Sequence, residues 1–142
     1  MKYADIIAKL PYEPPFLFVD EITRLDNDSV EGTYRFREDE FFYAGHFKGN
    51  PVTPGVILTE CMAQIALVCL GIYLLNHQKS VPAQVAFTSS DVEYLKMILP
   101  GETVRVKASK VFWRMGKLKV RAELFNESGD LACRGILAGM IK

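Results

Sequence analysis

Residues 55–75 constrain the fold of this chain more than any other segment. Placed on a helix, they are apolar on every side, and only Thr59, Glu60 and Gln64 interrupt them. A helix without a polar face must be buried. Thr53 is the predicted N-cap and Pro54 the first helical residue, because such a pair often begins a helix. The rest of the chain must therefore form the walls of a core around one long helix.

The same segment is not predicted to span a membrane. Glu60 and Gln64 fall in its first half, and the uninterrupted remainder, residues 65–75, is shorter than a bilayer requires. The sequence also lacks a basic and apolar leader followed by a small-residue cleavage site. We therefore expect a soluble, cytoplasmic protein that does not act on a membrane.

Composition predicts a single domain over residues 1–142. Of the 142 residues 49% are hydrophobic, and no linker-like stretch divides them. The 17 basic and 17 acidic residues balance, which argues against a surface built for nucleic acid. The three cysteines have neither metal-binding nor disulfide spacing, so they are predicted to be small core residues in a reducing compartment.

Strand patterns lie on both sides of the long helix. Before it, the patterns predict a short helix and a two-stranded hairpin, at residues 3–10, 16–25 and 29–37. After it, four strands are predicted at residues 82–94, 103–113, 117–125 and 131–141. The first is rich in β-branched and aromatic residues, the third alternates apolar and polar residues, and turns at residues 115–116 and 127–130 separate the last three. This order of elements indicates the α+β class.

The predicted sheet and helix fit together in only one way. An antiparallel sheet can cover an apolar cylinder only by curling around it, and a second copy of the chain can cover what remains exposed. The predicted fold is therefore a curled antiparallel sheet wrapped around one long buried helix, in a homodimer.

Two titratable side chains lie near the start of this helix. His46 belongs to a loop rich in glycine and proline, and Glu60 is the only acid on the helix. An imidazole titrates near neutral pH, and burial raises the pKa of a carboxyl group, so the pair could act as base and acid in a dry cavity. Each residue also has a purely structural interpretation, as a hydrogen-bonding loop histidine or as a paired helical carboxylate.

Residues 45–64, GHFKGNPVTPGVILTECMAQ, resemble the signature of the FabZ-type 3-hydroxyacyl-[acyl carrier protein] dehydratases, which runs roughly GHFPxxPVMPGVLxxEAxAQ. Residues 15–20, PFLFVD, resemble the family's PFLLVD strand, and residues 100–102, PGE, resemble its PGD turn. The resemblance implies a hotdog fold and an obligate dimer. It also implies an active site at the dimer interface, with His46 from one subunit and Glu60 from the other.

The implied reaction removes water from a 3-hydroxyacyl thioester on acyl carrier protein and leaves a trans-2-enoyl thioester, in fatty acid or related polyene and polyketide-like biosynthesis. His46 would take the proton next to the carbonyl, and Glu60 would protonate the departing hydroxyl. We expect the N–H groups of Gly55 and Val56 to bind the thioester oxygen at the positive end of the helix. Phe47, which follows His46 in the motif, is expected to contact the substrate.

Gln64 lies one helical turn after Glu60. It either orients the Glu60 carboxylate or satisfies backbone groups. The chemistry calls for neither a metal nor an organic cofactor. His77, just past the helix, is assigned no chemistry.

The sequence departs from the family pattern at several positions. Lys48 replaces the usual proline, Thr53 a common methionine, and Tyr12-Glu13 a frequent His-Arg pair. Lys48 and Thr53 lie beside the motif, whereas Tyr12 is far from the catalytic pair in sequence. The strand after the helix is also less basic than is usual in the family, because it contains Asp91, Glu93 and Leu95.

The predicted partners are acyl carrier protein and further copies of the chain, as a homodimer or as two or three dimers assembled together. We expect Lys48 and basic residues of the hairpin over 103–125 to lie near the entrance for an acidic carrier. Two alternative functions are a hotdog thioesterase or acyl-CoA hydratase, and a non-catalytic acyl-binding hotdog subunit.

Overall fold

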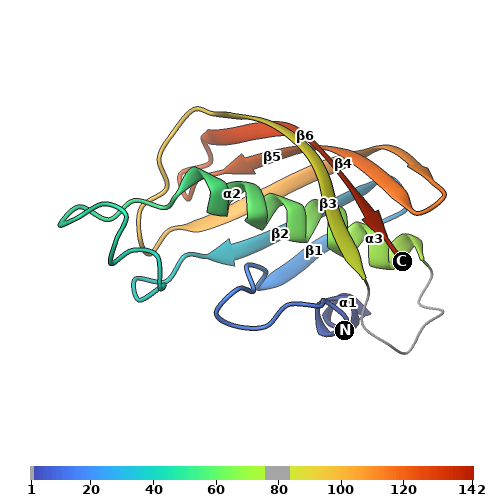
Figure 1. The fold of residues 1–142 in the computed structure, drawn as a ribbon, viewed down its shortest axis with the longest axis horizontal. Coiled ribbons are helices and arrows are strands. Elements are labelled where there is room, and N and C mark those ends of the chain that lie inside the picture. Colours follow the sequence, from blue (N-terminus) through green and yellow to red (C-terminus); the bar gives the residue numbers. More distant parts are fainter. Residues whose placement is uncertain (1, 76–83) are drawn as a thin grey trace.

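The computed structural model describes residues 2–75 and 84–142. Its first elements are helix α1 (Lys2–Ala8) and strands β1 (Glu21–Leu25) and β2 (Ser29–Arg35). The long helix follows, in three consecutive segments: α2 (Gly55–Met62), the π-helical η1 (Ala63–Cys69) and α3 (Leu70–Leu74). Four strands complete the chain (Figure 1): β3 (Val85–Tyr94), β4 (Thr103–Arg114), β5 (Lys117–Phe125) and β6 (Leu131–Ile141).

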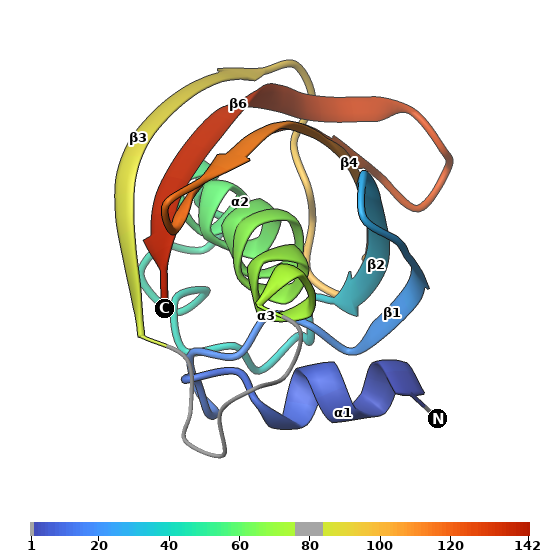
Figure 2. The same ribbon diagram turned by 90° about the vertical axis from the view of Figure 1, so that its right-hand side faces the viewer.

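The six strands form one antiparallel sheet in the order β1-β2-β4-β5-β6-β3. The sheet curls around the long helix, which runs through its concave side (Figure 2). Helix α1 packs against β1. The predicted α+β hotdog fold is thereby confirmed.

Alternation within the central strands builds the core. In the first half of β4 and throughout β5 every second residue is buried, including Val104, Val106, Leu118 and Val120, none of which has exposed surface. Residues between them point to the outer face of the sheet. The helix contributes Ile65, with no exposed surface, to the same apolar cluster.

Strand β3 forms one edge of the sheet and is poorly covered. Of its residues only Val85 and Val92 are partly buried, and the others are exposed. Two large side chains, Phe87 and Tyr94, keep 44% and 48% of their surface exposed. An edge strand with exposed aromatic residues can pair with another chain.

The helix differs from its prediction in where it begins. Gly55, not Pro54, is the first helical residue, and Pro54 holds the cap position without a side-chain hydrogen bond. The Thr53 side chain is buried and hydrogen-bonds the Tyr43 hydroxyl at 2.5 Å. Thr53 therefore does not cap the helix, because its hydroxyl pairs with the loop instead.

The apolar stretch of the helix is longer than predicted. By length and composition Gly55–Leu74 could cross a membrane, but 78% of its most apolar window is buried inside the fold. Burial, rather than the interruptions at Glu60 and Gln64, identifies it as a core helix.

The first strand is shorter than predicted. It begins at Glu21 rather than at residue 16, and β2 ends at Arg35 rather than at residue 37. The backbone before β1 pairs with a side chain: the Phe18 N–H donates to Gln64 Oε1 at 2.8 Å. The predicted start of β3 at residues 82–83, and His77, lie outside the described residues.

Candidate active site

His46 is held in a tight loop by backbone hydrogen bonds. The Val52 N–H donates to the His46 carbonyl at 2.8 Å, and Phe47 and Asn50 bond each other through their N–H and carbonyl groups. His46 Nδ1 lies 2.9 Å from the Val52 carbonyl oxygen. A carbonyl oxygen only accepts hydrogen bonds, so Nδ1 carries a proton and donates it. In the neutral ring this leaves the lone pair on Nε2, which is the arrangement that a base requires.

A groove of about 440 Å³ lies beside this histidine. Its wall includes His46, Phe47, Gly55, Tyr94 and Lys96. The rings of His46 and Phe47 are stacked with centroids 4.0 Å apart, and Phe47 is 53% exposed. The groove thus brings the predicted base to the start of the helix.

The first turn of α2 leaves two donors available. The N–H groups of Ile57 and Leu58 bond the Pro54 carbonyl, whereas within residues 2–75 and 84–142 no acceptor pairs with the N–H of Gly55 or Val56. Helix N-termini attract negative charge through such N–H groups. An oxyanion in the groove could therefore be bound at Gly55. The Val56 side chain is 74% exposed.

Gly55 also permits a close contact that the sequence did not predict. A Cβ atom at this position would lie 3.0 Å from the Tyr94 ring. The Tyr94 hydroxyl hydrogen-bonds Thr59 Oγ1 in the same helix. Strand β3 is thus joined to the start of the helix, and Tyr94 closes one side of the His46 groove.

Glu60 faces a different cavity. This cavity measures about 40 Å³ and, among the described residues, contains Tyr12 as the only other polar side chain. Burial raises the pKa of the Glu60 carboxyl group, and a hydrogen bond from Gln64 lowers it by a smaller amount. A carboxyl group with a raised pKa can hold a proton closer to neutral pH and so can act as an acid.

Gln64 has no exposed surface and uses its amide fully. Its Oε1 accepts from the Phe18 N–H, and its Nε2 donates to the Phe16 carbonyl and to Glu60 Oε2, each at 3.0 Å. It therefore makes both kinds of contact that the sequence left open, one with the carboxylate and two with the backbone.

Within one chain the structure does not bring His46 and Glu60 together. The groove that contains His46 and the cavity that contains Glu60 share no lining residue. His46 is grouped with Gly55, and Glu60 with Gln64.

The structure adds residues that sequence reasoning missed. Tyr12 shares the Glu60 cavity, although it precedes that residue by far in the sequence, and Lys96 lines the His46 groove. The only signal at Tyr12 was its departure from the family's usual histidine. Lys96 gave no signal, since it lies in an irregular segment after β3.

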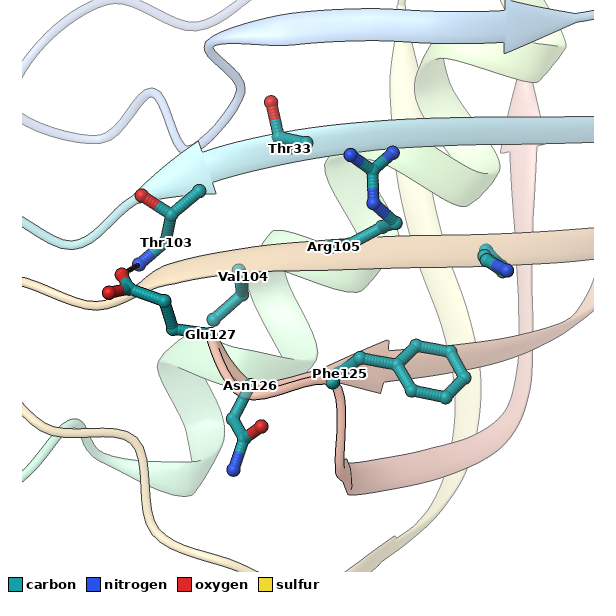
Figure 3. A pocket seen from close by; sticks show the side chains of 9 residues that line it. Thr33, Thr103, Val104, Arg105, Phe125, Asn126 and Glu127 are labelled. Carbon is teal, nitrogen blue, oxygen red and sulfur yellow. Dashed lines mark hydrogen bonds between the residues drawn. The ribbon is translucent and has the colours of Figure 1, made fainter.

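The outer face of the sheet carries most of the basic residues predicted to dock a carrier. In register across it, charges alternate from strand to strand: Glu31, Lys107, Glu123, Arg134 and Glu93. A depression of about 370 Å³ lies on this face beside Arg105, Lys107 and Phe125, with the Lys107 ammonium 5.6 Å from the Phe125 ring centre (Figure 3). Opposite charges on neighbouring strands compensate one another.

The tip of the β4–β5 hairpin is also remote from the groove. It lies at the opposite end of the long axis from the loop that contains His46 (Figure 1). The basic residues at the hairpin tip therefore lie far from the His46 loop within one chain, and the expectation that one or more hairpin basic residues lie near the entrance stays a prediction. Lys48 is exposed in the loop itself.

Sequence comparisons identify the relatives of this chain. The family model for the FabA-like domain matches residues 10–129. A 3-hydroxyacyl-[acyl-carrier-protein] dehydratase FabZ of Deinococcus radiodurans is 31% identical, covering 87% of this chain and 83% of the relative. The FabZ dehydratase of Methylobacterium nodulans is 36% identical, covering 87% and 82%.

Solved structures show the same fold at low identity. The dehydratase heterocomplex ApeI:P from Xenorhabdus doucetiae has a TM-score of 0.80 at 14% identity, covering 96% of this chain and 90% of that chain. A hypothetical thioesterase with coenzyme A from Streptococcus pneumoniae has a TM-score of 0.62 at 15% identity, covering 99% and 94%. The match over most of the chain and the identity to full-length relatives establish that this protein belongs to the FabA-like family, with the FabZ 3-hydroxyacyl-[acyl-carrier-protein] dehydratases.

Proposed function

We propose that this protein dehydrates 3-hydroxyacyl thioesters on acyl carrier protein to trans-2-enoyl thioesters, in fatty acid or related polyene and polyketide-like biosynthesis in the cytoplasm. The observation that carries the proposal is the state of Glu60. A carboxyl group lies in an apolar cavity, its pKa is raised by burial, and a fully buried amide holds it in place. Such a group suits protonation of a leaving hydroxyl.

The reaction uses the groups on the two sides of the helix start. His46 Nε2 takes a proton from the carbon next to the thioester carbonyl. The N–H groups of Gly55 and Val56 stabilise negative charge on the thioester oxygen. Glu60 gives its proton to the hydroxyl on the next carbon, so the C–O bond breaks, the C=C bond forms and water leaves. Transfer of the proton from His46 back to Glu60, through solvent, restores the starting state.

In a dimer, a second copy of the chain would bring its His46 close to Glu60 of the first. The N-terminal half of β3 lines the Glu60 cavity through Phe87, and its last residue, Tyr94, lines the His46 groove. If two β3 edges pair antiparallel about a two-fold axis, the beginning of each lies beside the end of the other. The Glu60 cavity of one chain then adjoins the His46 groove of its partner. We therefore place the site in a homodimer, alone or in a larger assembly of dimers.

Carrier docking is best placed beside the His46 groove. Lys48 is exposed in the loop that contains His46, and Lys96 lines the groove, where it pairs with Asp130 at 3.2 Å. Exposed charges of this kind mainly speed association with an oppositely charged partner. An acidic carrier protein that delivers its arm into the groove would meet both lysines.

The proposal is tested by two substitutions and a control. His46→Ala and Glu60→Gln should each reduce dehydration about a hundred- to ten-thousand-fold, because a positioned proton-transfer group contributes that much. Glu31→Gln is the matched control, since Glu31 lies on the outer face of the sheet. Enoyl product is measured with a 3-hydroxyacyl carrier-protein substrate, with circular dichroism to verify folding.

Other outcomes would point to other functions. Free acid in place of enoyl thioester would indicate a thioesterase. Full activity in a folded His46→Ala protein would contradict the assigned base. No turnover of any acyl thioester would indicate an acyl-binding subunit.

A further inference from the structure

The Glu60 cavity has an unusual polar composition. Its described walls come from the first loop, the long helix, β3 and β6, and apart from Glu60 and Tyr12 they consist of apolar side chains and one glycine. Ala63 and Leu67 supply the helical side, and Phe87 and Met140 belong to the two strands. Among the described residues, the Tyr12 phenol is thus the one hydrogen-bonding side chain that a ligand would meet after passing Glu60.

The Tyr12 hydroxyl is available for such a ligand. Within residues 2–75 and 84–142 it forms no hydrogen bond with protein, and because no buried side-chain oxygen there lacks a partner, solvent reaches the hydroxyl. Its ring packs against the hydrophobic core, so the side chain is fixed in position. Burial and the nearby charge of Glu60 raise the pKa of Tyr12 to about 12, so the phenol keeps its proton at neutral pH and can donate a hydrogen bond.

The place of the cavity makes contact with an acyl chain unavoidable. It extends along the helix from Glu60 to Val68, in the direction that a substrate must follow once its 3-hydroxyl is beside Glu60. At about 40 Å³ the cavity is narrow. Any atoms that enter therefore lie against its walls, including Tyr12.

We propose that Tyr12 is a specificity-determining residue that donates a hydrogen bond to an oxygen-bearing acyl chain, and so favours such substrates over saturated ones. This inference rests on the proposed function. A saturated chain would displace water from the phenol and leave the hydroxyl without a partner, which is unfavourable in an apolar site. A chain with an acceptor oxygen at the right position replaces that water and keeps the hydrogen bond.

The test compares matched substrates on wild type and Tyr12→Phe. The substrates are N-acetylcysteamine thioesters of 3-hydroxydecanoic acid and of analogues in which an ether oxygen replaces the methylene at carbon 5, 6 or 7. For each enzyme the ratio of kcat/KM for an ether substrate to kcat/KM for the saturated one is measured. Taking ratios between enzymes cancels the effect of the ether on intrinsic reactivity.

Removal of the hydroxyl should lower this ratio about three- to tenfold at one ether position or more, the range expected for one hydrogen bond. Tyr3→Phe is the control, because the Tyr3 hydroxyl donates to the Leu25 carbonyl, outside the cavity, and its ratio should equal that of wild type. An unchanged ratio in Tyr12→Phe at all three positions would overturn the inference. Failure of wild type to dehydrate either substrate series would instead contradict the proposed function.

We expect Tyr12→Phe to fold as wild type does, so a changed ratio reports on substrate selection. The Tyr12 hydroxyl has no hydrogen-bond partner in residues 2–75 and 84–142, so its loss breaks no hydrogen bond within that part of the chain. Thermal unfolding of Tyr12→Phe should match that of wild type. A drop in kcat/KM by the same factor on every substrate would show that Tyr12 supports Glu60 rather than selecting the chain, and would also overturn the inference.

Discussion

The two candidate catalytic side chains are positioned by different kinds of partner. A backbone carbonyl fixes the ring of His46, so its orientation depends on the shape of one loop. A buried amide fixes Glu60, and that amide is itself bonded to the strand segment at Phe16 and Phe18. Loss of the Gln64 amide would leave buried backbone groups unpaired at about 1–3 kcal/mol each. Gln64 therefore couples the candidate acid to the stability of the fold.

Glu60 should make stability depend on pH in a recognisable direction. Its pKa is raised in the folded protein by burial, above the ordinary value of 4.5, so the unfolded chain loses its proton first. The free energy of unfolding of wild type then falls as pH rises from 4.5 through the raised pKa, and is constant above it. In Glu60→Gln this fall in the free energy of unfolding is absent, because glutamine does not titrate. Its stability relative to wild type should increase across that window, as measured by urea unfolding at a series of pH values.

Asp26→Asn is a control in which stability relative to wild type should change with pH in the opposite direction. Hydrogen bonds from the Asp28 and Ser29 N–H groups lower the pKa of Asp26. Its contribution is present above the unfolded pKa and disappears as pH falls through the lowered folded pKa. Asp26→Asn should therefore lose stability relative to wild type as pH rises through this range. A difference in stability between Glu60→Gln and wild type that stays constant with pH, while Asp26→Asn shows its expected change, would show that Glu60 titrates as it does in water.

At the scale of residues, the sequence indicated which side chains could be catalytic better than it indicated which residues lie in contact. His46, Glu60 and Gln64 belong to one continuous motif, so all three could be named as candidates before the fold was known. Tyr12 could not be placed, because only the path of the chain around the helix brings it beside Glu60. The contact of Tyr94 with Gly55 was unpredictable for the same reason.

Among the elements, β3 is held by one neighbour and carries residues of both cavities. Among the described strands it pairs only with β6, in an antiparallel register that places Val92 opposite Gly135. At Gly135 a Cβ atom would lie 2.4 Å from the Asp91 carbonyl oxygen and 2.9 Å from Val92 Cα. Both are backbone atoms, so a side chain cannot be accommodated without moving the strand.

Gly135→Ala should therefore displace β3 and weaken both the fold and the proposed pairing of two chains through β3. Overpacking of this kind costs about 1–3 kcal/mol, and we expect a lower melting temperature and a larger fraction of monomer in size-exclusion chromatography. Gly45→Ala is the matched control, since nothing lies within 4 Å of its Cβ position. A wild-type melting temperature and elution volume for Gly135→Ala would mean that β3 tolerates displacement.

Element types were easier to predict than element ends. The predicted bounds of β5 and β6 are confirmed, because turns flank both strands and the strands pair along their length. The strand before the turn at residues 26–28 begins late, since the Gln64 side chain occupies the backbone groups of Phe16 and Phe18 that a neighbouring strand would otherwise bond. Nothing in the sequence signals the π-helical segment η1 or the shift of the helix start to Gly55.

For the whole molecule, one sheet covers the helix incompletely. The exposed apolar residues include Phe47 and Val56 at the start of the helix and Tyr94, Leu95 and Met97 around the end of β3. Several of them also line the His46 groove. Exposed apolar surface of this kind is typical of an interaction site, and its position at the groove supports the proposed dimer site.

This connection gives a test that needs no structure of the dimer. In a dimer of His46→Ala with Glu60→Gln, the site that combines His46 of one chain with Glu60 of the other is intact, and the second site carries both substitutions. Statistical exchange makes about half of the dimers mixed, so about a quarter of all sites should be intact. The mixture should then recover about a quarter of wild-type activity, from two preparations that are nearly inactive. His46→Ala exchanged with a differently tagged copy of itself controls for exchange alone and should remain inactive. If tagged subunits exchange fully and activity does not return, His46 and Glu60 act within a single chain, and the cavity and groove must meet by rearrangement of that chain instead.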